Sequence, residues 1–375
     1  MRNLTFPLFL ILCLAACATK STENILTANT PNIFLDTVYM ESGEDVIFFT
    51  FNGLGVSDLS EDGRYLYNFD FKTPALEVFD LETYTLSERI LFEKEGPNGV
   101  GTLVYDFNRI GRSLFFLGSR DFNYGLFNLK AEKIRNIPFE GLEKIWGKPV
   151  SMNQGEVLNE SPLMLGGHFT MWSTDGGQNE TQLGVWNIDE EKMDTYQMGQ
   201  WFDVAQFEST MTSASYDMPV KSYWVTVKAV HGRMLASTNV TSDLMVYHEG
   251  AFEKKSISHQ LIPSQNSFKL SPQYDSQKAF ENDFKKSQES INFSHPVWDA
   301  TLERFYRFAY QAIPSSEESY KVYLVAMNKN FELLWEMEVP VLRKRPNFHF
   351  VKDGEIWMFE NIQDEVAFIR IRMED

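Results

Sequence analysis

One short unit of sequence recurs along most of this chain. In its first copy a turn and strand, Ser60–Asp70, precede a second strand, Ala75–Leu81, and a third, Leu86–Phe92. Apolar and polar residues alternate within the strands and Gly-containing turns separate them, which is the pattern of antiparallel β-structure. The same strand pair returns as Gly111–Leu117 with Tyr124–Leu129, Leu163–Trp172 with Leu183–Ile188, Gly232–Ala236 with Asp243–Tyr247, Arg304–Tyr310 with Val322–Asn328, and Asp353–Phe359 with Val366–Ile371.

These six copies, called units 1 to 6 below, predict the fold. Residues 32–375 provide roughly 57 residues per unit, enough for a four-stranded sheet with its loops. The last unit reaches Asp375 after three strands, and an unassigned strand near the start, Ile33–Tyr39 or Val46–Phe51, can supply the fourth. We therefore predict an all-β domain, a six-bladed β-propeller closed by an N-terminal strand, which removes an open sheet edge. A pair of β-sandwiches is the alternative, but it does not explain one unit repeated in this way.

One segment between units 4 and 5 departs from the repeat. It runs from His259 to Ile291, and Ser276–Ile291 places Phe280 and Phe284 four residues apart, a helical spacing. We predict one short helical insertion here. It is either a lid or partner-docking helix, or a helix that packs its two Phe side chains on the outer surface of a blade.

The N-terminus has the pattern of an export signal. Arg2 precedes an apolar run, residues 4–14, which is far shorter than the roughly 20 residues that span a bilayer. The run ends in Leu14-Ala15-Ala16-Cys17, which resembles the lipobox of bacterial lipoproteins; an ordinary secretory signal with a chance Cys is the alternative. The resemblance implies a signal peptide over residues 1–16, lipidation of Cys17 and a flexible tether over residues 17–31. We expect a lipid anchor in the cell envelope, on the periplasmic side of the outer membrane.

Charge and cysteine content narrow the choice of partners. The chain holds 52 acidic against 34 basic residues, a formal net charge of −18, which disfavours nucleic acid and anionic lipid surfaces. Its two cysteines are Cys13, within the predicted signal, and Cys17. No disulfide is therefore expected in the mature domain.

Two further stretches carry a resemblance to a known family. Glu93–Gly101 after unit 1 and Asn292–Asp299 before Arg304–Phe308, together with the lipobox and the six units, resemble a family of Bacteroidota lipoproteins. That family is described as a domain of unknown function and is grouped with TolB-like six-bladed propellers. The resemblance implies the fold and the envelope address, and it implies no activity.

No catalytic motif is evident in the sequence. There is no Gly-x-Ser-x-Gly motif or paired zinc-binding histidine pattern, and Gly96–Gly101 lacks the Lys-Ser/Thr of a phosphate loop. Asp58–Gly63 begins like a calcium loop, but Phe69 stands where the bidentate acid is needed, so a hairpin turn is the better interpretation. We expect no cofactor and no metal.

A propeller can still bring distant residues together, because the first strand of each blade lines its central channel. Trp298 and Asp299, with Arg304 and Arg307 nearby, suit sugar or peptide binding. The alternative is a buried Trp beside an Asp–Arg ion pair. The candidate channel or rim residues are Asp58, Asp106, Arg109, His295, Trp298, Asp299, Arg304 and His349.

The sequence favours a binding role. We expect an envelope module that binds a protein, peptide or glycan, because the anchor and the repeats are present without a catalytic motif. The alternative is a hydrolase, lactonase or lyase with a metal or acid site at the channel mouth. A role as sensor or assembly factor of a transporter also stays open.

Overall fold

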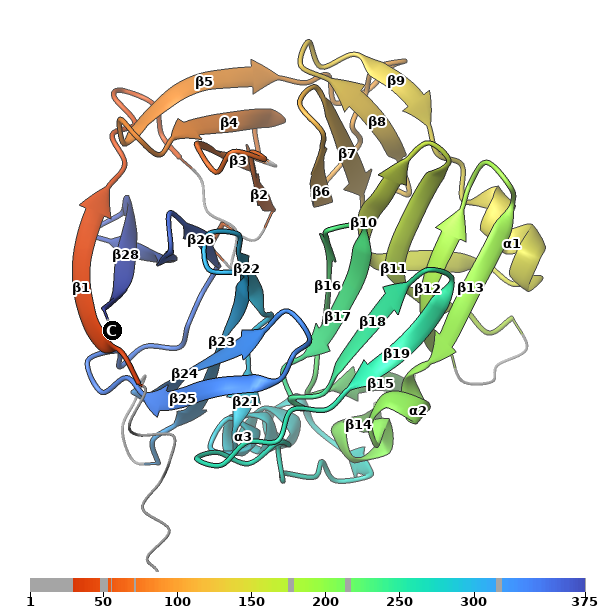
Figure 1. Ribbon diagram of the computed structural model, residues 1–375. Coiled ribbons are helices and arrows are strands. Elements are labelled where there is room, and N and C mark those ends of the chain that lie inside the picture. Colours follow the sequence, from red (N-terminus) through yellow and green to blue (C-terminus); the bar gives the residue numbers. More distant parts are fainter. Residues whose placement is uncertain are drawn as a thin grey trace, which may run out of the picture.

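The computed structural model describes residues 30–47, 53–54, 56–70, 72–174, 179–212, 217–314 and 319–374. In this part of the chain the predicted all-β class is confirmed, since its strands form seven sheets, six of four or five strands and one of three. Figure 1 shows the six larger sheets following one another around a common centre. The predicted signal peptide, Cys17 and nearly all of the predicted tether lie outside the described residues.

Each repeated unit forms one of the larger sheets, with strands paired in chain order. Unit 1 consists of β2 (Ser57–Leu59), β3 (Tyr65–Asp70), β4 (Ala75–Asp80) and β5 (Thr85–Leu91). Unit 2 consists of β6 (Val104–Ile110), β7 (Leu114–Ser119), β8 (Tyr124–Asn128) and β9 (Lys133–Asn136). Unit 3 consists of β10 (Val150–Glu160), β11 (Leu163–Met171), β12 (Glu180–Asn187) and β13 (Lys192–Gln197). Unit 4 consists of β16 (Val225–Val230), β17 (Arg233–Thr238), β18 (Leu244–His248) and β19 (Ala251–Lys255). Unit 5 consists of β21 (Asn292–Phe293), β22 (Val297–Asp299), β23 (Arg304–Ala312), β24 (Tyr320–Asn328) and β25 (Leu333–Glu338). Unit 6 consists of β26 (His349–Lys352), β27 (Glu355–Ile362) and β28 (Glu365–Glu374). Both members of every predicted strand pair are present.

The sheet of unit 6 receives its fourth strand from the start of the domain. β1 (Asn32–Tyr39) lies antiparallel to β28, from Asn32 opposite Glu374 to Tyr39 opposite Ala367. This is the pairing that the incomplete last unit predicts. The other candidate strand, Val46–Phe51, lies mostly outside the described residues.

The turns of the units have a common local cause. Asp80, Asn128 and Asn328 each end a strand, and the side-chain oxygen of each accepts the backbone N–H two residues later at 2.9 Å. Such Asx turns let a polar side chain replace a backbone hydrogen bond in a tight reversal. The Asp or Asn that ends these strands is therefore a turn signal.

The calcium-loop pattern at residues 58–63 is a turn as well. The Ser60 hydroxyl donates to Asp62 at 2.6 Å, and Asp62 accepts the backbone N–H of Arg64 at 3.1 Å. Gly63 has φ of +68°, which glycine adopts at little steric cost. The predicted hairpin is confirmed.

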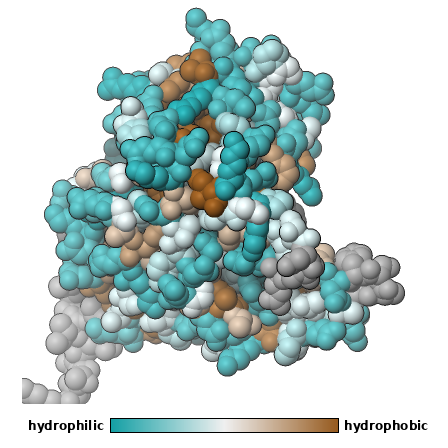
Figure 2. All heavy atoms as spheres, turned by 90° about the vertical axis from the view of Figure 1, so that its right-hand side faces the viewer, coloured by the Kyte–Doolittle hydropathy of each residue, from teal (hydrophilic) through white to brown (hydrophobic). Residues whose placement is uncertain are grey.

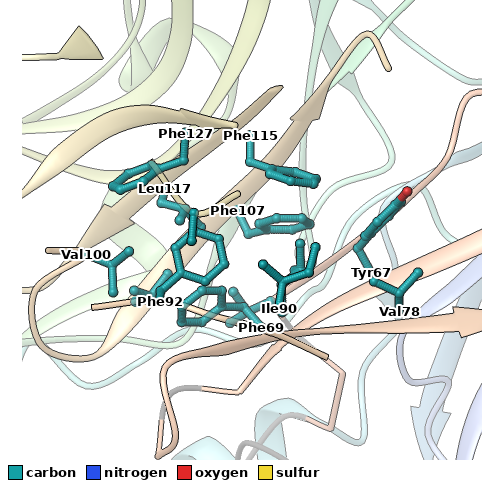
Figure 3. Packing of buried hydrophobic residues seen from close by; sticks show 14 residues of the cluster. Tyr67, Phe69, Val78, Ile90, Phe92, Val100, Phe107, Phe115, Leu117 and Phe127 are labelled. Atoms are coloured by element: carbon teal, nitrogen blue, oxygen red, sulfur yellow. The ribbon is translucent and has the colours of Figure 1, made fainter. Parts of the chain in front are cut away.

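Aromatic side chains fill the space between neighbouring sheets. Between units 1 and 2, Tyr67 packs against Phe115 with ring centroids 5.6 Å apart, and Phe92 packs against Phe127 at 5.8 Å (Figure 3). Burying each such ring contributes about 1.5–3 kcal/mol. Further clusters of the same kind join units 2 with 3, 3 with 4, 4 with 5, 5 with 6, and 6 with 1.

The prediction of a single helical insertion is incomplete. The structure adds α1 (Glu140–Trp146) between β9 and β10, and α2 (Met198–Trp201) with a 3₁₀ turn, η2 (Val204–Phe207), after β13. It also adds a three-stranded sheet of β14 (Glu208–Thr212), β15 (Asp217–Lys221) and β20 (Gln273–Tyr274). The two helices and the 3₁₀ turn were not predicted because helices of one or two turns have too few residues to show a helical period.

The predicted helix between units 4 and 5 is confirmed as α3 (Gln277–Ser287). The hydroxyl of Ser276 accepts the backbone N–H of Ala279 at 3.3 Å and caps its N-terminus. Phe280 packs on Tyr274, whereas Phe284 lines a cavity at the centre of the molecule. The alternative in which both rings pack on an outer blade surface is therefore wrong.

The segment leading to α3 is pinned to the sheet of unit 5. His259 Nδ1 lies 2.6 Å from the carboxylate of Glu336 on β25, and both side chains are at most 2% exposed. Glu336 also accepts the backbone N–H groups of Gln260, at 2.6 Å, and Leu261. These bonds outweigh the cost of burial and hold the pKa of Glu336 below its usual range.

The outer surface is largely polar where Figure 2 displays it. That view faces the side of β9 and α1, and hydrophobic residues there form small separate areas. Among the described residues, no helix combines the length and the apolar character needed to cross a bilayer. This face thus offers no broad apolar patch to a partner.

Candidate functional site

A cavity of about 960 Å³ lies where the first strands of the six units meet. Its walls come from β2, β6, β10, β16, β21 with β22, and β26, together with α3 and the loop before β26. Five predicted candidates line it: Asp58, Asp106, His295, Trp298 and His349. The structure thus brings these five residues together around one cavity.

Polar bonds link the neighbouring strands around the cavity. Asp58 on β2 accepts the backbone N–H of Arg109 on β6 at 2.9 Å, and Asp106 on β6 accepts that of Gly155 on β10 at 3.2 Å. On β10, Gln154 accepts the backbone N–H of Val227 on β16 at 3.1 Å. These side chains therefore hold the inner strands in place as well as facing the cavity.

The link from β10 to β16 also contains an ion pair. Lys228 Nζ lies 2.6 Å from Glu156 Oε1, and the Glu156 side chain is 6% exposed. Burial raises the pKa of Glu156, and Lys228 only partly offsets this. Burial lowers the pKa of Lys228, but Glu156 and Asp58 outweigh it, so the pKa is raised and the ammonium stays charged.

Asp106 is the least satisfied acid of the cavity. It is 3% exposed, and its Oδ2 has no hydrogen-bond partner among the described residues. Burial, reinforced by the neighbouring Glu156, raises the pKa of Asp106 to about 8. The group is thus poised to exchange a proton near neutral pH.

Two histidines complete the links. His295 Nδ1 lies 2.8 Å from the Ser237 hydroxyl, and burial holds its pKa well below the usual value. His349 Nδ1 donates to the carbonyl of Asn347 at 2.7 Å, which leaves Nε2 as an acceptor 3.3 Å from the Ser294 hydroxyl. Burial also lowers the pKa of His349, so both rings are neutral at pH 7.

A buried network behind β2 fixes the position of Asp58. The Ser57 hydroxyl donates to Asn68 at 2.9 Å, and the Asn68 amide donates to Glu77 at 2.8 Å. Arg89 on β5 then lies 3.2 Å from Glu77 and 3.1 Å from Asp70. This chain of bonds crosses all four strands of unit 1 and ends at the residue beside Asp58.

One end of the cavity carries an exposed cation on aromatic rings. The guanidinium carbon of Arg345 lies 4.8 Å from the ring centre of Trp224 and 5.6 Å from that of Tyr310. Arg345 is exposed, and no acidic side chain within the described ranges pairs with it. Phe284 of α3 lines the same cavity. We call this end, defined by Trp224, Phe284, Tyr310 and Arg345, the mouth.

Three predicted candidates lie away from the cavity walls. Asp299 is buried and accepts the backbone N–H groups of Thr301 and Leu302, as a turn cap. Arg304 stacks over Tyr306 at 5.9 Å on the outer side of unit 5. Arg109 contributes its backbone N–H to Asp58, while its side chain lies over a ring of unit 1.

The predicted Asp–Arg ion pair beside Trp298 is wrong. The Asp299 carboxylate caps a turn instead, and Trp298 packs on His231 at 5.1 Å and Phe305 at 4.7 Å. Arg307, which the sequence places in the same cluster, donates to backbone carbonyls. The arginines here thus serve packing and backbone satisfaction.

The acids and histidines of the cavity do not form a metal-type cluster. In the part of the chain that the structure describes, no three His, Cys, Asp or Glu side chains are grouped to hold an ion. Asp58, Asp106, His295 and His349 share one cavity but bond to different neighbours.

Sequence reasoning missed Glu156, Lys228, Trp224 and Arg345. The first two follow the same rule as Asp106, because they are polar residues on the first strand of a unit, with alternate positions facing the channel. Applying that alternation to Val225–Val230 places Thr226 and Lys228 on one face of the strand and the buried Val225 and Val227 on the other. Trp224 and Arg345 stand in loops, where no pattern marks them.

The family model of a domain of unknown function, DUF4221, matches residues 30–338. The chain belongs to this family. Among curated proteins, comparison with this sequence gives no match. The family membership agrees with the resemblance noted in the sequence, and it brings no activity with it.

Solved structures from Bacteroides share the fold of this DUF4221 chain. A DUF4221 member from Bacteroides vulgatus has 14% identity and a TM-score of 0.67, covering 92% of this chain and 99% of its own. A candidate exported protein from Bacteroides fragilis has 10% identity and a TM-score of 0.55, covering 92% and 96%. At these identities the likeness extends to the fold alone.

Proposed function

We propose that this DUF4221 protein is a lipid-anchored envelope protein that binds a small ligand or a peptide or glycan segment of a partner in its central cavity. The cavity of about 960 Å³ at the meeting point of six units carries the proposal. It falls in the size range of ligand sites, roughly 300–1,000 Å³, and combines aromatic walls with a few charged groups.

The fold proposal that goes with this function is a six-bladed, TolB-like propeller. It is supported by six sheets of four or five strands, by their arrangement around one centre in Figure 1, and by the β1–β28 pairing. In such a ring the inner strands give a rigid site whose walls need no reorganisation on binding.

The envelope address is supported by the lipobox pattern that ends at Cys17. A diacylated or triacylated Cys gives stable anchoring, which a single chain does not. Cys17→Ser is expected to abolish incorporation of labelled fatty acid and to remove the protein from the detergent-released membrane fraction. Unchanged labelling in the Cys17→Ser chain contradicts the anchor.

The binding role is tested on the full chain purified in detergent from its native envelope. Native mass spectrometry is expected to show a bound mass that disappears on denaturation. Photo-crosslinking from Trp224, replaced by a photoreactive residue, should label the same compound or partner, whereas crosslinking from exposed Arg112 should not. A chain without any bound mass or mouth-specific crosslink contradicts the proposal.

A second candidate function is acid–base catalysis in the same cavity. It is favoured by Asp106, with a pKa near 8 and an unpartnered oxygen, and by the raised pKa of Glu156. Hydrolysis of chromogenic glycosides or lactones by the full chain, lost in Asp106→Asn, would support it. Equal rates in both chains would eliminate Asp106 from such a role.

A further inference from the structure

The N-terminal segment enters the domain at the end opposite the mouth. The mouth lies where the inner strands begin, because Trp224 directly precedes β16 and Arg345 stands in the loop before β26. From there β26, β27 and β28 follow one another as antiparallel neighbours, so β28 ends at the far end of unit 6. Asn32, the first residue of β1, lies opposite Glu374 at this end. The predicted tether therefore joins the domain on the face that points away from the mouth.

The length of the predicted tether keeps this face near the lipid anchor. Residues 17–31 reach at most about 50 Å when fully extended, and a flexible chain of this length spans about 20 Å on average. Cys17 carries the acyl chains in the function proposed above, and the present inference rests on that anchor. The face that contains Asn32 is then the part of the domain held nearest to the bilayer.

A shallow pocket of about 480 Å³ lies on the same face, at the turns of unit 5. It is formed by the turn from β22 to β23 and the turn from β24 to β25, both at the ends of strands that start on the mouth side. Its lining includes Leu302, Glu303, Arg304, Lys329, Leu334 and Trp335. Trp335 packs in the same hydrophobic cluster as Ile33, which joins the pocket to the start of β1. We call it the base pocket.

Large apolar side chains are exposed around the base pocket and the start of β1. Leu302 and Leu334 are 45% and 40% exposed, and Phe34 and Leu35 are 50% and 36% exposed. A single exposed leucine is ordinary on a protein surface, but these four gather around one pocket and one attachment point. Apolar side chains of an interfacial segment enter a bilayer by about 5–10 Å, to the boundary of headgroups and acyl chains.

The base pocket also carries an excess of positive charge in an acidic protein. Arg304 and Lys329 line it against one acid, Glu303, whereas the whole chain has a net charge of −18. Among the described residues neither cation forms an ion pair, and the guanidinium of Arg304 lies over the ring of Tyr306. Arginine and lysine are the side chains that bind phosphate groups. Cations for headgroup phosphates thus stand beside leucines for the acyl boundary.

We propose that the base pocket and the start of β1 form the surface through which the anchored domain contacts the phospholipid bilayer. Arg304 and Lys329 bind headgroup phosphates, and Leu302 and Leu334 enter the acyl boundary. The mouth then faces away from the bilayer and takes its ligand from the aqueous side. A protein partner on the same pocket is the competing occupant.

The test uses the full lipidated chain, reconstituted into vesicles of phosphatidylethanolamine and phosphatidylglycerol that contain a doxyl-labelled phospholipid. An environment-sensitive fluorophore is attached to one introduced cysteine, Leu334→Cys or Val341→Cys. Both changes replace an exposed aliphatic residue of unit 5, but Val341 follows β25 and lies at the mouth end. We expect the doxyl lipid to quench the fluorophore at position 334 at least threefold more strongly than at position 341.

A pair of double variants tests the two cations. Arg304→Gln with Lys329→Gln, in the Leu334→Cys chain, should reduce the quenching at position 334 at least threefold. The matched control is Arg112→Gln with Lys130→Gln, which removes exposed cations from the corresponding turns of unit 2. The control should be quenched as the parent is. Thermal melts confirm that the variants are folded.

Equal quenching at the two positions, or stronger quenching at position 341, overturns the bilayer contact and leaves the pocket to a protein partner. Quenching in the Arg304 and Lys329 double variant that equals that of the parent overturns the phosphate contacts. The anchor fails separately, when the Cys17→Ser chain stays in the membrane fraction. When Cys17→Ser leaves that fraction and the two positions are equally quenched, the anchor stands and only the contact is lost.

Discussion

Arg307 on β23 offers the sharpest test of how the inner strands are held. Its side chain is 1% exposed, and its guanidinium donates to four backbone carbonyls, those of Ser294 at 2.6 Å, Ser242 at 2.8 Å, Thr238 at 2.9 Å and Thr241 at 3.2 Å. It thereby ties the loop after β17 to the segment between β21 and β22. Among the described residues no carboxylate forms an ion pair with it, and burial lowers its pKa to about 9, against a smaller opposing effect of Asp243.

Replacing Arg307 by Met removes all four donors and leaves the carbonyls in place. Each buried carbonyl that loses its donor costs about 1–3 kcal/mol. The substitution also removes the cost of burying the cation, and the Met side chain fills part of the volume. We therefore expect the free energy of unfolding to fall by about 4 kcal/mol, which is within the range measured when a buried charged group loses its partners. For a chain of 375 residues the unfolding entropy is about 0.8 kcal/mol/K, which converts the loss to about 5 °C in Tm.

The assay is urea denaturation followed by tryptophan fluorescence, with the midpoint and slope fitted separately. The control is Arg304→Met on the same strand, whose half-buried guanidinium only stacks on Tyr306. That change should cost less than about 1 kcal/mol. If Arg307→Met lowers the free energy of unfolding no more than the control does, the four carbonyls find other donors and the reasoning is refuted.

The remaining predictions concern the pinned insertion and one turn. Glu336→Gln should lower the unfolding free energy by about 1–3 kcal/mol at pH 7, since it removes the charge facing His259. Because the folded pKa of Glu336 is lowered, its contribution is present above the unfolded pKa and is lost as pH falls through the folded one. Urea melts should thus show the difference at pH 7 shrinking below about pH 4, and a constant difference contradicts the linkage. Gly101→Ala should destabilise more than Gly111→Ala in the same melts, because an added Cβ at Gly101 meets Asp121 Oδ1, whereas the one at Gly111 meets nothing within 4 Å. Equal losses would show that only the positive φ, +84° and +53°, matters.

The fold class was largely accessible from the sequence, and the site only in part. The first-strand argument brought Asp58, Asp106, His295 and His349 to one cavity, because strand position within a repeat decides which residues lie near the centre. It misplaced Asp299 and Arg304, since a turn cap and an outer-face arginine look the same in sequence as residues of a site. The residues next to Asp299 and Arg304 in the sequence do not distinguish a structural role from a role in a site.

What the sequence determined by itself is local structure. The alternation of apolar and polar residues determines the strands, an Asp or Asn at a strand end, such as Asp80, determines a turn, and the spacing of Phe280 and Phe284 with the Ser276 cap determines α3. These depend on residues a few positions apart, so they can be read without knowing the rest of the chain. The tertiary structure alone decided that Phe284 faces the cavity and that the guanidinium of Arg345 lies over the rings of Trp224 and Tyr310. Those contacts join segments far apart in sequence, and they form only because packing between sheets fixes where each loop and strand end lies.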